Sequence, residues 1–350
     1  MYQFRKIYLT CLLMALAMAL HAQSISLKYE KMLTNPQGYV AYRTAGNIKV
    51  DGKLDEVSWK NAPYTTSFVG IKDGETPKQE TRAKMLWDDT YLYIGVELEE
   101  SDVQARLSQR DTIVFYDNAL EVLIDPDGDG QNYFEIETNA KGTIFDLFVQ
   151  QPYRTPQPSF ATFEWDAKGM LLKTNVKGTL NKSRDKDQGW TVEMAIPRQS
   201  IAREFDNYLQ AGNYLRLGMA RVQWENGKDS YTTWGAFGKA AIHMPERWGF
   251  VYLSDKKVGS ATEEFQYPTN YNLERLLWAM FYEQASHFAE TGSYYTRTEQ
   301  LKLHTYEVEN LPKETRIKVE GTSRSYVIVA TMADGSQTSI NENGLLLRTK

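Results

Sequence analysis

Cysteine is almost absent from this chain of 350 residues. Its single cysteine, Cys11, lies in an apolar N-terminal segment, so the rest of the chain has no disulfide, no thiolate metal site and no cysteine nucleophile. Basic charge is not in excess either, because the formal net charge is −5. A nucleic-acid partner needs a basic face, so we expect none. No later segment has the long apolar run of a membrane helix, so we expect no membrane span in the mature chain.

The first residues have the pattern of a secretory signal. Arg5 and Lys6 precede an apolar run over residues 7–20, and Ala22 supplies a small residue for cleavage. We therefore predict a signal peptide over residues 1–22 and an exported protein that is periplasmic or extracellular. Removing the signal changes the formal net charge from −5 to −7, because the only charged residues that leave are these two basic ones.

Short segments with β-type patterning fill the middle of the chain, and turn residues separate them. This series predicts an all-β fold, a β-sandwich or barrel, over residues 39–255, after a polar leader over residues 23–38. The main predicted strands are Thr81–Trp87, Tyr91–Leu98, Ala119–Ile124, Tyr133–Thr138, Thr143–Val149, Leu171–Thr179, Trp190–Ile196, Tyr214–Trp224 and Phe250–Leu253.

The pattern changes after Asp255. Apolar residues from Leu273 to Phe288 recur at steps of three and four, which predicts an amphipathic helix. Two β-type runs around the turn Ala333–Gly335 predict a hairpin. We therefore predict a C-terminal helix and β-hairpin extension over residues 256–350. The apolar helix face is expected to pack on the hairpin or the sandwich, and the alternative is a protein partner bound through this helix.

Aromatic residues are abundant, with 22 Tyr and 8 Trp. Sugar-binding proteins use flat aromatic faces to stack on pyranose rings, but a large β core also buries aromatic residues. Trp59 and Trp190 are flanked by apolar positions, so we expect both in the core. Trp224 and Trp234 stand beside polar or glycine residues, where a ring can lie either in the core or against a ligand.

Several motifs follow one another in a recognisable order. Residues 48–56 with Trp59 come first, then residues 83–96, 117–125 and 189–197, and a closing segment over residues 243–249. Together they resemble carbohydrate-binding module family 9 and its family-9-like relatives, over Tyr39–Leu253. The resemblance implies a β-sandwich that binds an oligo- or polysaccharide without cleaving it, in the service of polysaccharide capture or degradation. It also implies bound calcium in some members.

The resemblance places a ligand site around Phe115, where the family has one of two Trp residues that clamp a sugar. Glu121 matches a sugar-contacting Glu, whereas the family's Arg and Asn positions hold Glu135 and Glu137. The second Trp position falls at Ile242, so the two-Trp clamp is absent. The candidate ligand-binding residues are Phe115, Tyr116, Asp117, Glu121, Glu135, Glu137, Arg221, Trp224, Trp234 and His243.

Several of these candidates can be interpreted either as sugar contacts or as structural residues. Arg221 offers a planar fork of donors to sugar hydroxyls. Glu135 and Glu137 alternate on one face of a strand, where they form either a cluster of acceptors for hydroxyls or a cation, or a solvated outer face. His243 is either a hydrogen-bonded structural residue or a ligand contact beside the former clamp position.

An acidic turn offers a candidate calcium site. Asp125, Asp127 and Asp129 alternate with Pro126, Gly128 and Gly130, which resembles the start of a calcium loop. The position of the bidentate Glu of an EF-hand holds Ile136, so an ordinary acidic β-turn is the alternative. We expect no required cofactor, and Ca²⁺ at this loop is the candidate bound ion.

Two other functions remain as alternatives. A glycoside hydrolase or an auxiliary enzyme of polysaccharide breakdown needs a pair of carboxylates, but nothing in the sequence singles out such a pair, so no catalytic residue is assigned. The chain has no G-x-S-x-G, H-E-x-x-H or P-loop motif. A haem-binding sandwich would use Met85, Met219 or His243 as ligands, without a C-x-x-C-H attachment motif.

Overall fold

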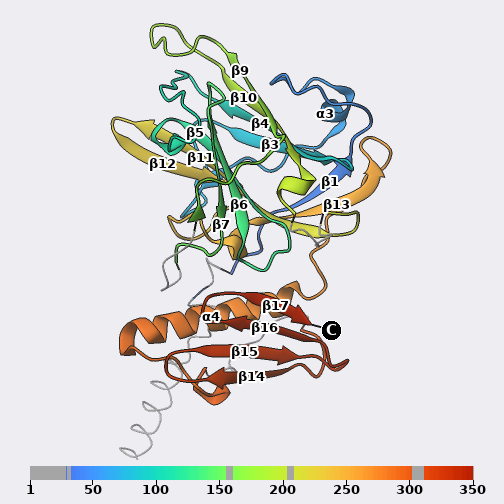
Figure 1. Ribbon diagram of the computed structural model, residues 1–350, viewed down its shortest axis with the longest axis vertical. Helices are drawn as coiled ribbons and strands as arrows, with labels where there is room; N and C mark the ends of the chain where they lie inside the picture. Colours follow the sequence, from blue (N-terminus) through green and yellow to red (C-terminus); the bar gives the residue numbers. More distant parts are fainter. Residues whose placement is uncertain (1–28, 30–32, 155–160, 203–208, 302–310, 350) are drawn as a thin grey trace, which may run out of the picture. The chain divides into compact units, whose positions relative to one another are not determined.

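A computed structural model describes residues 29, 33–154, 161–202, 209–301 and 311–349 of the chain (Figure 1). The predicted signal peptide and most of residues 23–32 lie outside the described residues. The chain forms two compact units. The larger one spans residues 35–268, and the smaller one contains residues 269–350 together with the N-terminal segment up to residue 34. No described helix has the length and apolar character needed to cross a bilayer.

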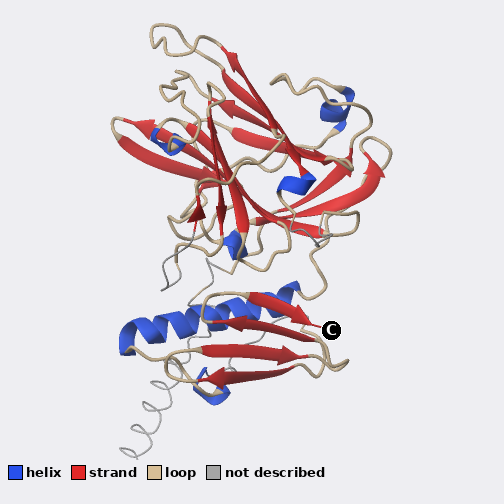
Figure 2. Ribbon diagram, viewed as in Figure 1, coloured by secondary structure: helices blue, strands red, loops and turns tan. Residues whose placement is uncertain are grey.

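The larger unit is a β-sandwich, as predicted, and most of its strands begin and end within one or two residues of the predicted bounds (Figure 2). Its helical segments are α3 (Val57–Asn61) and the single turns η2 (Val114–Tyr116), η3 (Arg198–Ser200) and η4 (Pro245–Arg247). The strands are β1 (Gly38–Arg43), β2 (Val69–Gly70), β3 (Thr81–Trp87), β4 (Tyr91–Glu99), β5 (Ala119–Asp125), β6 (Tyr133–Asn139), β7 (Ile144–Val149), β8 (Ala161–Thr162), β9 (Leu171–Lys177), β10 (Gly189–Pro197), β11 (Tyr214–Glu225), β12 (Lys228–Thr233) and β13 (Gly249–Lys257).

One hydrogen-bonded sheet supplies both layers of the sandwich, in the strand order β8-β7-β6-β5-β11-β13-β1-β3-β4-β10-β9. Strand β1 is the corner. Its first half, from Gly38 to Ala41, pairs in parallel with β13, and its last residues, Tyr42 and Arg43, pair in parallel with β3. The register shifts between Ala41 and Arg43. Such an irregularity bends a strand, which allows the sheet to turn from one layer into the other.

The core lies between the two layers. Every second residue of β5, for example Leu120 and Val122, points into it and meets residues such as Ile94 and Met194 from the opposite layer. The opposite face of β5 and β6 carries a second apolar cluster that includes Leu123, together with three glutamates described below. The outer face of this layer is therefore also covered rather than open to solvent.

The motifs of the sequence hold the sandwich together. The carboxylate of Glu193 on β10 accepts hydrogen bonds from the backbone N–H groups of Asp51 and Gly52 at 2.8 and 2.9 Å, and from Trp59 Nε1 at 2.9 Å. Trp59 and Trp190 are buried, as predicted. The first and fourth motifs are therefore two halves of one structural contact.

The smaller unit contains helix α4 (Tyr271–Thr291), the turn η5 (Thr298–Leu301) and a four-stranded antiparallel sheet. The sheet consists of β14 (Arg316–Gly321), β15 (Tyr326–Thr331), β16 (Gln337–Asn341) and β17 (Leu346–Thr349). The predicted hairpin is thus part of a larger sheet. Helix α4 contacts β15 and β16, so its apolar face packs on this sheet. Tyr29 of the leader belongs to this unit, since its hydroxyl donates to Glu283 at 3.1 Å.

Candidate functional site

A cavity of about 580 Å³ lies on the outer face of β5, β6 and β7, and we call it the acidic cavity. Five of the candidate residues line it: Phe115, Glu121, Glu135, Glu137 and His243. They come from η2, β5 and β6, which follow one another in the sequence, and from the distant segment before η4. The other lining residues are Ile71, Ile113, Phe145, Leu147, Tyr153, Phe163, Asp229, Tyr231, Ala240, Ala241 and Ile242.

Three carboxyl groups share the floor of the acidic cavity. In the antiparallel pairing of β5 with β6, Glu121 lies opposite Glu137, and Glu135 lies two residues further along the same face. Only 1% of Glu121 and 3% of Glu135 and Glu137 are exposed. The alternative of a solvated outer face is therefore wrong, because loops and neighbouring side chains cover this part of the sheet.

Burial and mutual repulsion shift the titration of these groups. Both causes raise the pKa of Glu121 and of Glu135 well above the ordinary value for Glu. Burial raises the pKa of Glu137 to about 7, although its Oε2 accepts a hydrogen bond from the backbone N–H of Phe115 at 3.0 Å. Among the described residues, Glu121 Oε2 has no hydrogen-bond partner.

His243 forms one wall of the acidic cavity. Its Nδ1 lies 2.8 Å from the hydroxyl of Tyr133, and the ring of Tyr153 meets its imidazole in a T-shaped arrangement at 4.4 Å between centroids. Burial lowers the pKa of His243 to about 4, so the imidazole is neutral near pH 7. Trp248, directly after η4, holds the segment that carries His243 in place, since its Nε1 donates to the carbonyl of Ile242 at 2.8 Å.

Aromatic side chains surround the mouth of the acidic cavity. Tyr153 is 47% exposed and Phe163 is 53% exposed, so both have ring surface available to a ligand. Neither of these two lining residues was predicted from the sequence, and nor were Asp229 and Tyr231. Tyr153 and Phe163 lie between β7 and β9, where aromatic residues near the prolines at 152, 156 and 158 were the only signal that could have drawn attention to them.

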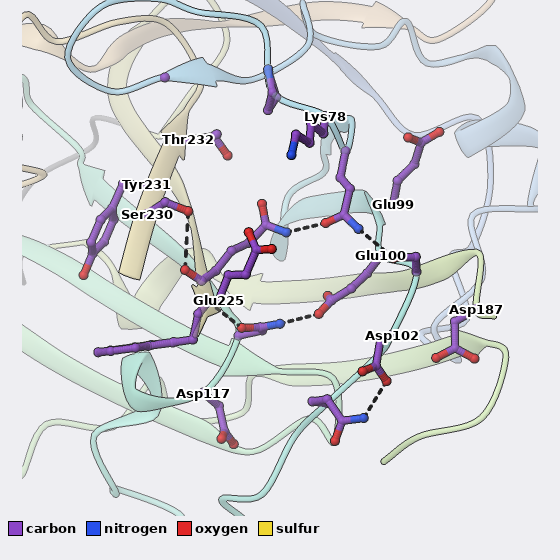
Figure 3. A pocket seen from close by; sticks show the side chains of 18 of the residues that line it. Lys78, Glu99, Glu100, Asp102, Asp117, Asp187, Glu225, Ser230, Tyr231 and Thr232 are labelled. Atoms are coloured by element: carbon purple, nitrogen blue, oxygen red, sulfur yellow. Dashed lines mark hydrogen bonds between the residues drawn. The ribbon is translucent and has the colours of Figure 1, made fainter. Parts of the chain in front are cut away.

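A second, larger cavity of about 1190 Å³ takes three other candidates, Tyr116, Asp117 and Trp224, and we call it the polar cavity (Figure 3). Tyr231 lines both cavities. Of two adjacent residues, Phe115 lines the acidic cavity and Tyr116 lines the polar cavity, and their ring centroids are 4.5 Å apart. Carboxylate and amide groups dominate the polar cavity, among them Glu99, Glu100, Asp102, Asp187, Gln79, Gln188 and Gln223.

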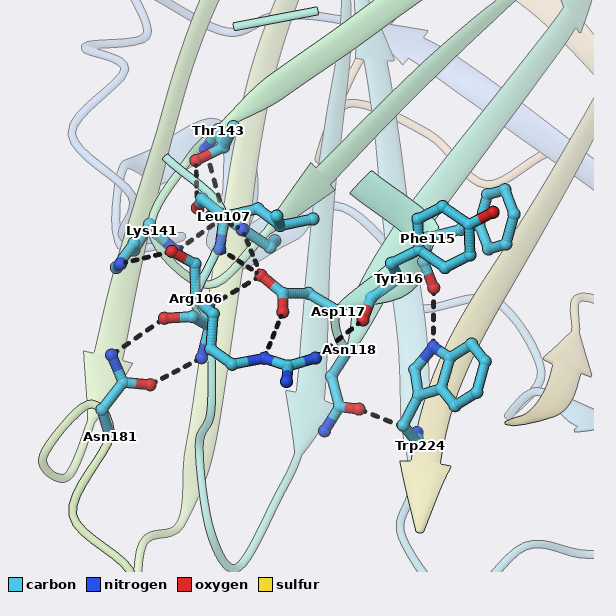
Figure 4. A network of polar contacts seen from close by, with 12 residues as sticks. Arg106, Leu107, Phe115, Tyr116, Asp117, Asn118, Lys141, Thr143, Asn181 and Trp224 are labelled. Atoms are coloured by element: carbon cyan, nitrogen blue, oxygen red, sulfur yellow. Dashed lines mark hydrogen bonds and ion pairs between the residues drawn. The ribbon is translucent and has the colours of Figure 1, made fainter. Parts of the chain in front are cut away.

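Asp117 and Trp224 both have partners within the protein (Figure 4). Asp117 Oδ2 accepts from the backbone N–H groups of Arg106 and Leu107 at 2.8 and 2.7 Å, so this carboxylate holds the 106–107 segment against the sheet. Trp224 Nε1 donates to the carbonyl of Phe115 at 2.6 Å. Trp224 therefore fixes the backbone that carries the aromatic residues of both cavities.

Arg221 and Trp234 line neither cavity. Arg221 pairs with Leu120 in the sheet and so points to the core face, whereas Glu121 points to the opposite face. The guanidinium donates to Thr81 Oγ1 at 2.9 Å and to the carbonyl of Glu99 at 2.6 Å. Trp234 is 2% exposed and belongs to the core between the layers.

The proposed haem ligands are not brought together. Met85 and Met219 are fully buried in the core between the layers. His243 lines the acidic cavity on the outer face of the same sheet that carries Met219. His243 therefore cannot share a haem with either methionine as a pair of axial ligands.

The acidic turn brings its three carboxylates together. Ligand oxygens of Asp125, Asp127 and Asp129 lie within 4.8 Å of one another. Asp125 is fully buried, and its oxygens accept hydrogen bonds from the backbone N–H groups of Gly128 and Gly130, both at 2.9 Å. Both glycines have positive φ, 66° and 87°, which folds the loop so that the carboxylates face one another.

The model of the family described as "Carbohydrate family 9 binding domain-like" matches residues 50–256. The chain belongs to this family. The family-9-like domain thus covers nearly all of the larger unit, including every strand from β2 to β13.

Curated relatives match the same domain. An exoglucanase, XynX, from Acetivibrio thermocellus is 28% identical over 163 residues, and an endo-1,4-beta-xylanase A from Thermoanaerobacterium saccharolyticum is 26% identical over 164 residues. Each alignment covers 46% of this chain but only 12% of the relative. The likeness is therefore to one part of each of these large enzymes.

A solved structure has the same fold. It is the crystal structure of a protein from Bacteroides uniformis that is provisionally described as carbohydrate-binding. It superimposes with a TM-score of 0.50 at 14% sequence identity, and the match covers 62% of this chain and 99% of that one. The similarity supports the sandwich architecture of the family-9-like domain.

Proposed function

We propose that this protein binds an oligo- or polysaccharide in the acidic cavity, without cleaving it. The observation that carries the proposal is the convergence on one cavity of Phe115 from η2, Glu121 from β5 and His243 from the closing segment. A family-9-like domain and relatives named as xylan- or glucan-degrading enzymes support carbohydrate as the ligand class.

The chemistry of the acidic cavity suits a sugar. A pyranose has apolar C–H faces that stack on aromatic rings, and hydroxyls that donate to carboxylates. Phe115, Tyr153 and Phe163 supply ring surface, and the glutamates supply acceptors. The volume of about 580 Å³ lies in the ordinary range for small-molecule sites.

Calorimetric titration with a panel of plant and microbial oligosaccharides tests the proposal. We expect binding of at least one saccharide at millimolar concentration or below, and Phe115→Ala to weaken it by about tenfold or more. Tyr64→Ala is a matched control, because Tyr64 is an exposed aromatic residue that lines neither cavity. The absence of binding to every saccharide, or equal loss in both variants, would overturn the proposal.

We also propose calcium at Asp125, Asp127 and Asp129. Hard oxygen ligands clustered within 4.8 Å fit Ca²⁺, which would offset the repulsion between these carboxylates. Added Ca²⁺ should raise the Tm of chelator-treated protein, and Asp127→Asn should reduce this rise. Asp334→Asn, in an exposed turn of the smaller unit, is the control. An unchanged Tm on adding Ca²⁺ would leave the alternative of an ordinary acidic turn.

A glycosidase is the second candidate function, and the titration of Glu137 favours it. A carboxylic acid with a pKa of about 7, beside other carboxylates, is the type of group that glycosidases use as a general acid. Incubation with polysaccharides and measurement of new reducing ends decides between the two. Release of reducing ends by the wild type but not by Glu137→Gln would replace the binding-only function.

Export completes the proposed function, and it rests on the signal pattern of residues 1–22. Expression of the full chain in a bacterial host, followed by mass measurement of the periplasmic protein, tests it. We expect a product that begins at Gln23, whereas an uncleaved product in the cytoplasm would refute export.

A further inference from the structure

Acidic groups line the acidic cavity without a basic side chain to balance them. Among the residues that the structure describes, its lining includes Glu121, Glu135, Glu137 and Asp229 and contains no Lys or Arg. His243 adds no positive charge, because its imidazole is neutral near pH 7. Because no described cation offsets these groups, ionisation of any of them makes the potential inside the cavity negative, and the cavity disfavours saccharides that carry carboxylate or sulfate groups.

One carboxylate oxygen in the acidic cavity lacks a partner. Glu121 is 1% exposed, and its Oε2 has no hydrogen bond to any residue that the structure describes. Glu137, opposite it in the sheet, has at least the backbone N–H of Phe115. A buried polar oxygen without a partner is costly, and a ligand that brings both a donor and a positive charge would satisfy this oxygen and favour the ionised form of the neighbouring carboxyl groups.

We propose that the acidic cavity selects saccharides with a protonated amine, such as 2-amino-2-deoxy sugars, over neutral and anionic saccharides. This inference rests on the proposed function and specifies the ligand class of the same site. The ammonium group lies among the carboxylates of Glu121, Glu135 and Glu137, and the sugar ring lies against the aromatic residues.

The spacing of the carboxylates favours an ammonium group over a metal ion. Within the described parts of the chain, the groups of three acidic residues whose oxygens approach within 4.8 Å are the Asp125 loop and the set of Asp111, Asp146 and Asp166. The three glutamates of the acidic cavity form no such group. They surround a wider space than the first shell of a Ca²⁺ ion, whose oxygen ligands lie at about 2.3–2.6 Å from the metal.

The walls of the acidic cavity also suit a sugar cation. Tyr153, Phe163 and Tyr231 line it beside the carboxylates. Aromatic faces attract ammonium groups through their quadrupole, in addition to stacking on the C–H face of a pyranose. Both contacts need a ligand that combines a ring with a positive charge.

Titration of the purified protein with three matched oligosaccharides near neutral pH tests this inference. The probes are a β-1,4-linked glucosamine tetramer, the N-acetylated tetramer and cellotetraose, which differ only at C2. We expect the glucosamine tetramer to bind tighter than both others by about tenfold or more, as for a partly buried charge pair. Glu121→Gln and Glu135→Gln should lower this preference, measured as the ratio of the affinities for the amino sugar and the neutral sugar, to about threefold or less.

Two controls separate this selectivity from plain charge attraction. Glu320→Gln removes an exposed carboxylate of the smaller unit and should leave the preference unchanged. Tetralysine carries amines without a sugar ring and should bind at least about tenfold more weakly than the glucosamine tetramer. Equal affinity for all three saccharides, or for tetralysine, would overturn the amine selectivity but not carbohydrate binding. Binding of none of the saccharides would overturn the proposed function itself.

Discussion

Glu121, Glu135 and Glu137 have an effect on the protein even without a ligand. Three carboxyl groups on one buried patch cannot all ionise without strong repulsion, so the folded protein retains protons that the unfolded chain has released. This property links the stability of the fold to pH at the same residues that we assign to binding.

The stability of the larger unit should fall as pH rises from about 4.5 to about 7. The pKa of Glu137 is about 7 in the folded protein against an ordinary value of 4.5, so the folded state binds more protons than the unfolded state between these values. Glu137→Gln should flatten this dependence, which amounts to roughly 3 kcal/mol or less. Urea unfolding at several pH values measures it, with Glu320→Gln as the control. A wild-type profile that rises over this range would contradict the prediction.

The buried side chain of Arg221 stabilises the larger unit. Its side chain is 1% exposed, and it lies 3.5 Å from Glu100 Oε2, which also accepts from Trp190 Nε1 at 2.8 Å. The expectation that Arg221 binds sugar hydroxyls overlooked the alternation of β11. Arg221 is two residues from Met219, a core residue, and period two places both on the core face.

Arg221→Ala should destabilise the protein by about 3–5 kcal/mol, because it leaves the carboxylate of Glu100 buried and unpaired. Sugar affinity of the folded fraction should stay unchanged. Lys49→Ala is the control, since Lys49 forms an exposed ion pair with Asp51 and its loss should cost no more than about 1 kcal/mol. Denaturant unfolding and calorimetry measure both quantities. Loss of sugar binding at unchanged stability would show instead that Arg221 contributes to sugar binding.

At the scale of elements, the close packing of β11 against the segment before β13 positions His243. A Cβ atom on Gly218 would lie 2.7 Å from Trp248 Cδ1, so only glycine fits under this indole ring. Trp248 is fully buried and holds the carbonyl of Ile242. The depth at which His243 enters the acidic cavity therefore depends on a glycine in a neighbouring strand.

Gly218→Ala should lower stability by about 1–3 kcal/mol, as other overpacked sites do, and should also weaken sugar binding by displacing Trp248. Gly46→Ala is the matched control, because its Cβ would meet no atom within 4 Å. Thermal unfolding and calorimetric titration check the two effects. Equal behaviour of the two variants would show that the contact with Trp248 does not constrain this region.

The strands were largely predictable from the sequence, whereas the loops and side chains that cover the outer face of β5 and β6 were not. The runs that became β3 to β7, β10 and β11 alternate or are uniformly β-type over six or more residues, so their local signal is strong. The acidic cavity also depends on Phe115, which lies in the single turn η2, and on Tyr153, which lies in an irregular segment. Their positions are set by tertiary contacts with strands far away in sequence, which no local pattern encodes.

At the scale of the whole molecule, the chain has two units with separate cores, and each is described by its own contacts. The resemblance to family 9 covers only the larger one. In the smaller unit, Ile328 of β15 is fully buried opposite Val319 and Ile340, whereas Leu347 is 49% exposed.

Ile328→Ala should destabilise the smaller unit by about 2–5 kcal/mol, because it creates a cavity in that core. We expect faster hydrogen exchange in β14–β17 and unchanged sugar affinity in the larger unit. Leu347→Ala, in the same sheet, should change neither. Hydrogen-exchange mass spectrometry and calorimetry provide the measurements. A loss of sugar binding in Ile328→Ala would show instead that the smaller unit supports the acidic cavity.

The corner strand β1 has a consequence for the order of folding. Tyr39 pairs with Val251, so the strand that joins the two layers cannot complete its pairing until β13 has been synthesised. Contacts between such distant residues slow folding and leave strand edges unpaired in the meantime. A chain that emerges from a ribosome or a translocation channel N-terminus first would therefore hold this domain open until nearly its last strand, and it would be most vulnerable to aggregation and proteolysis during that interval.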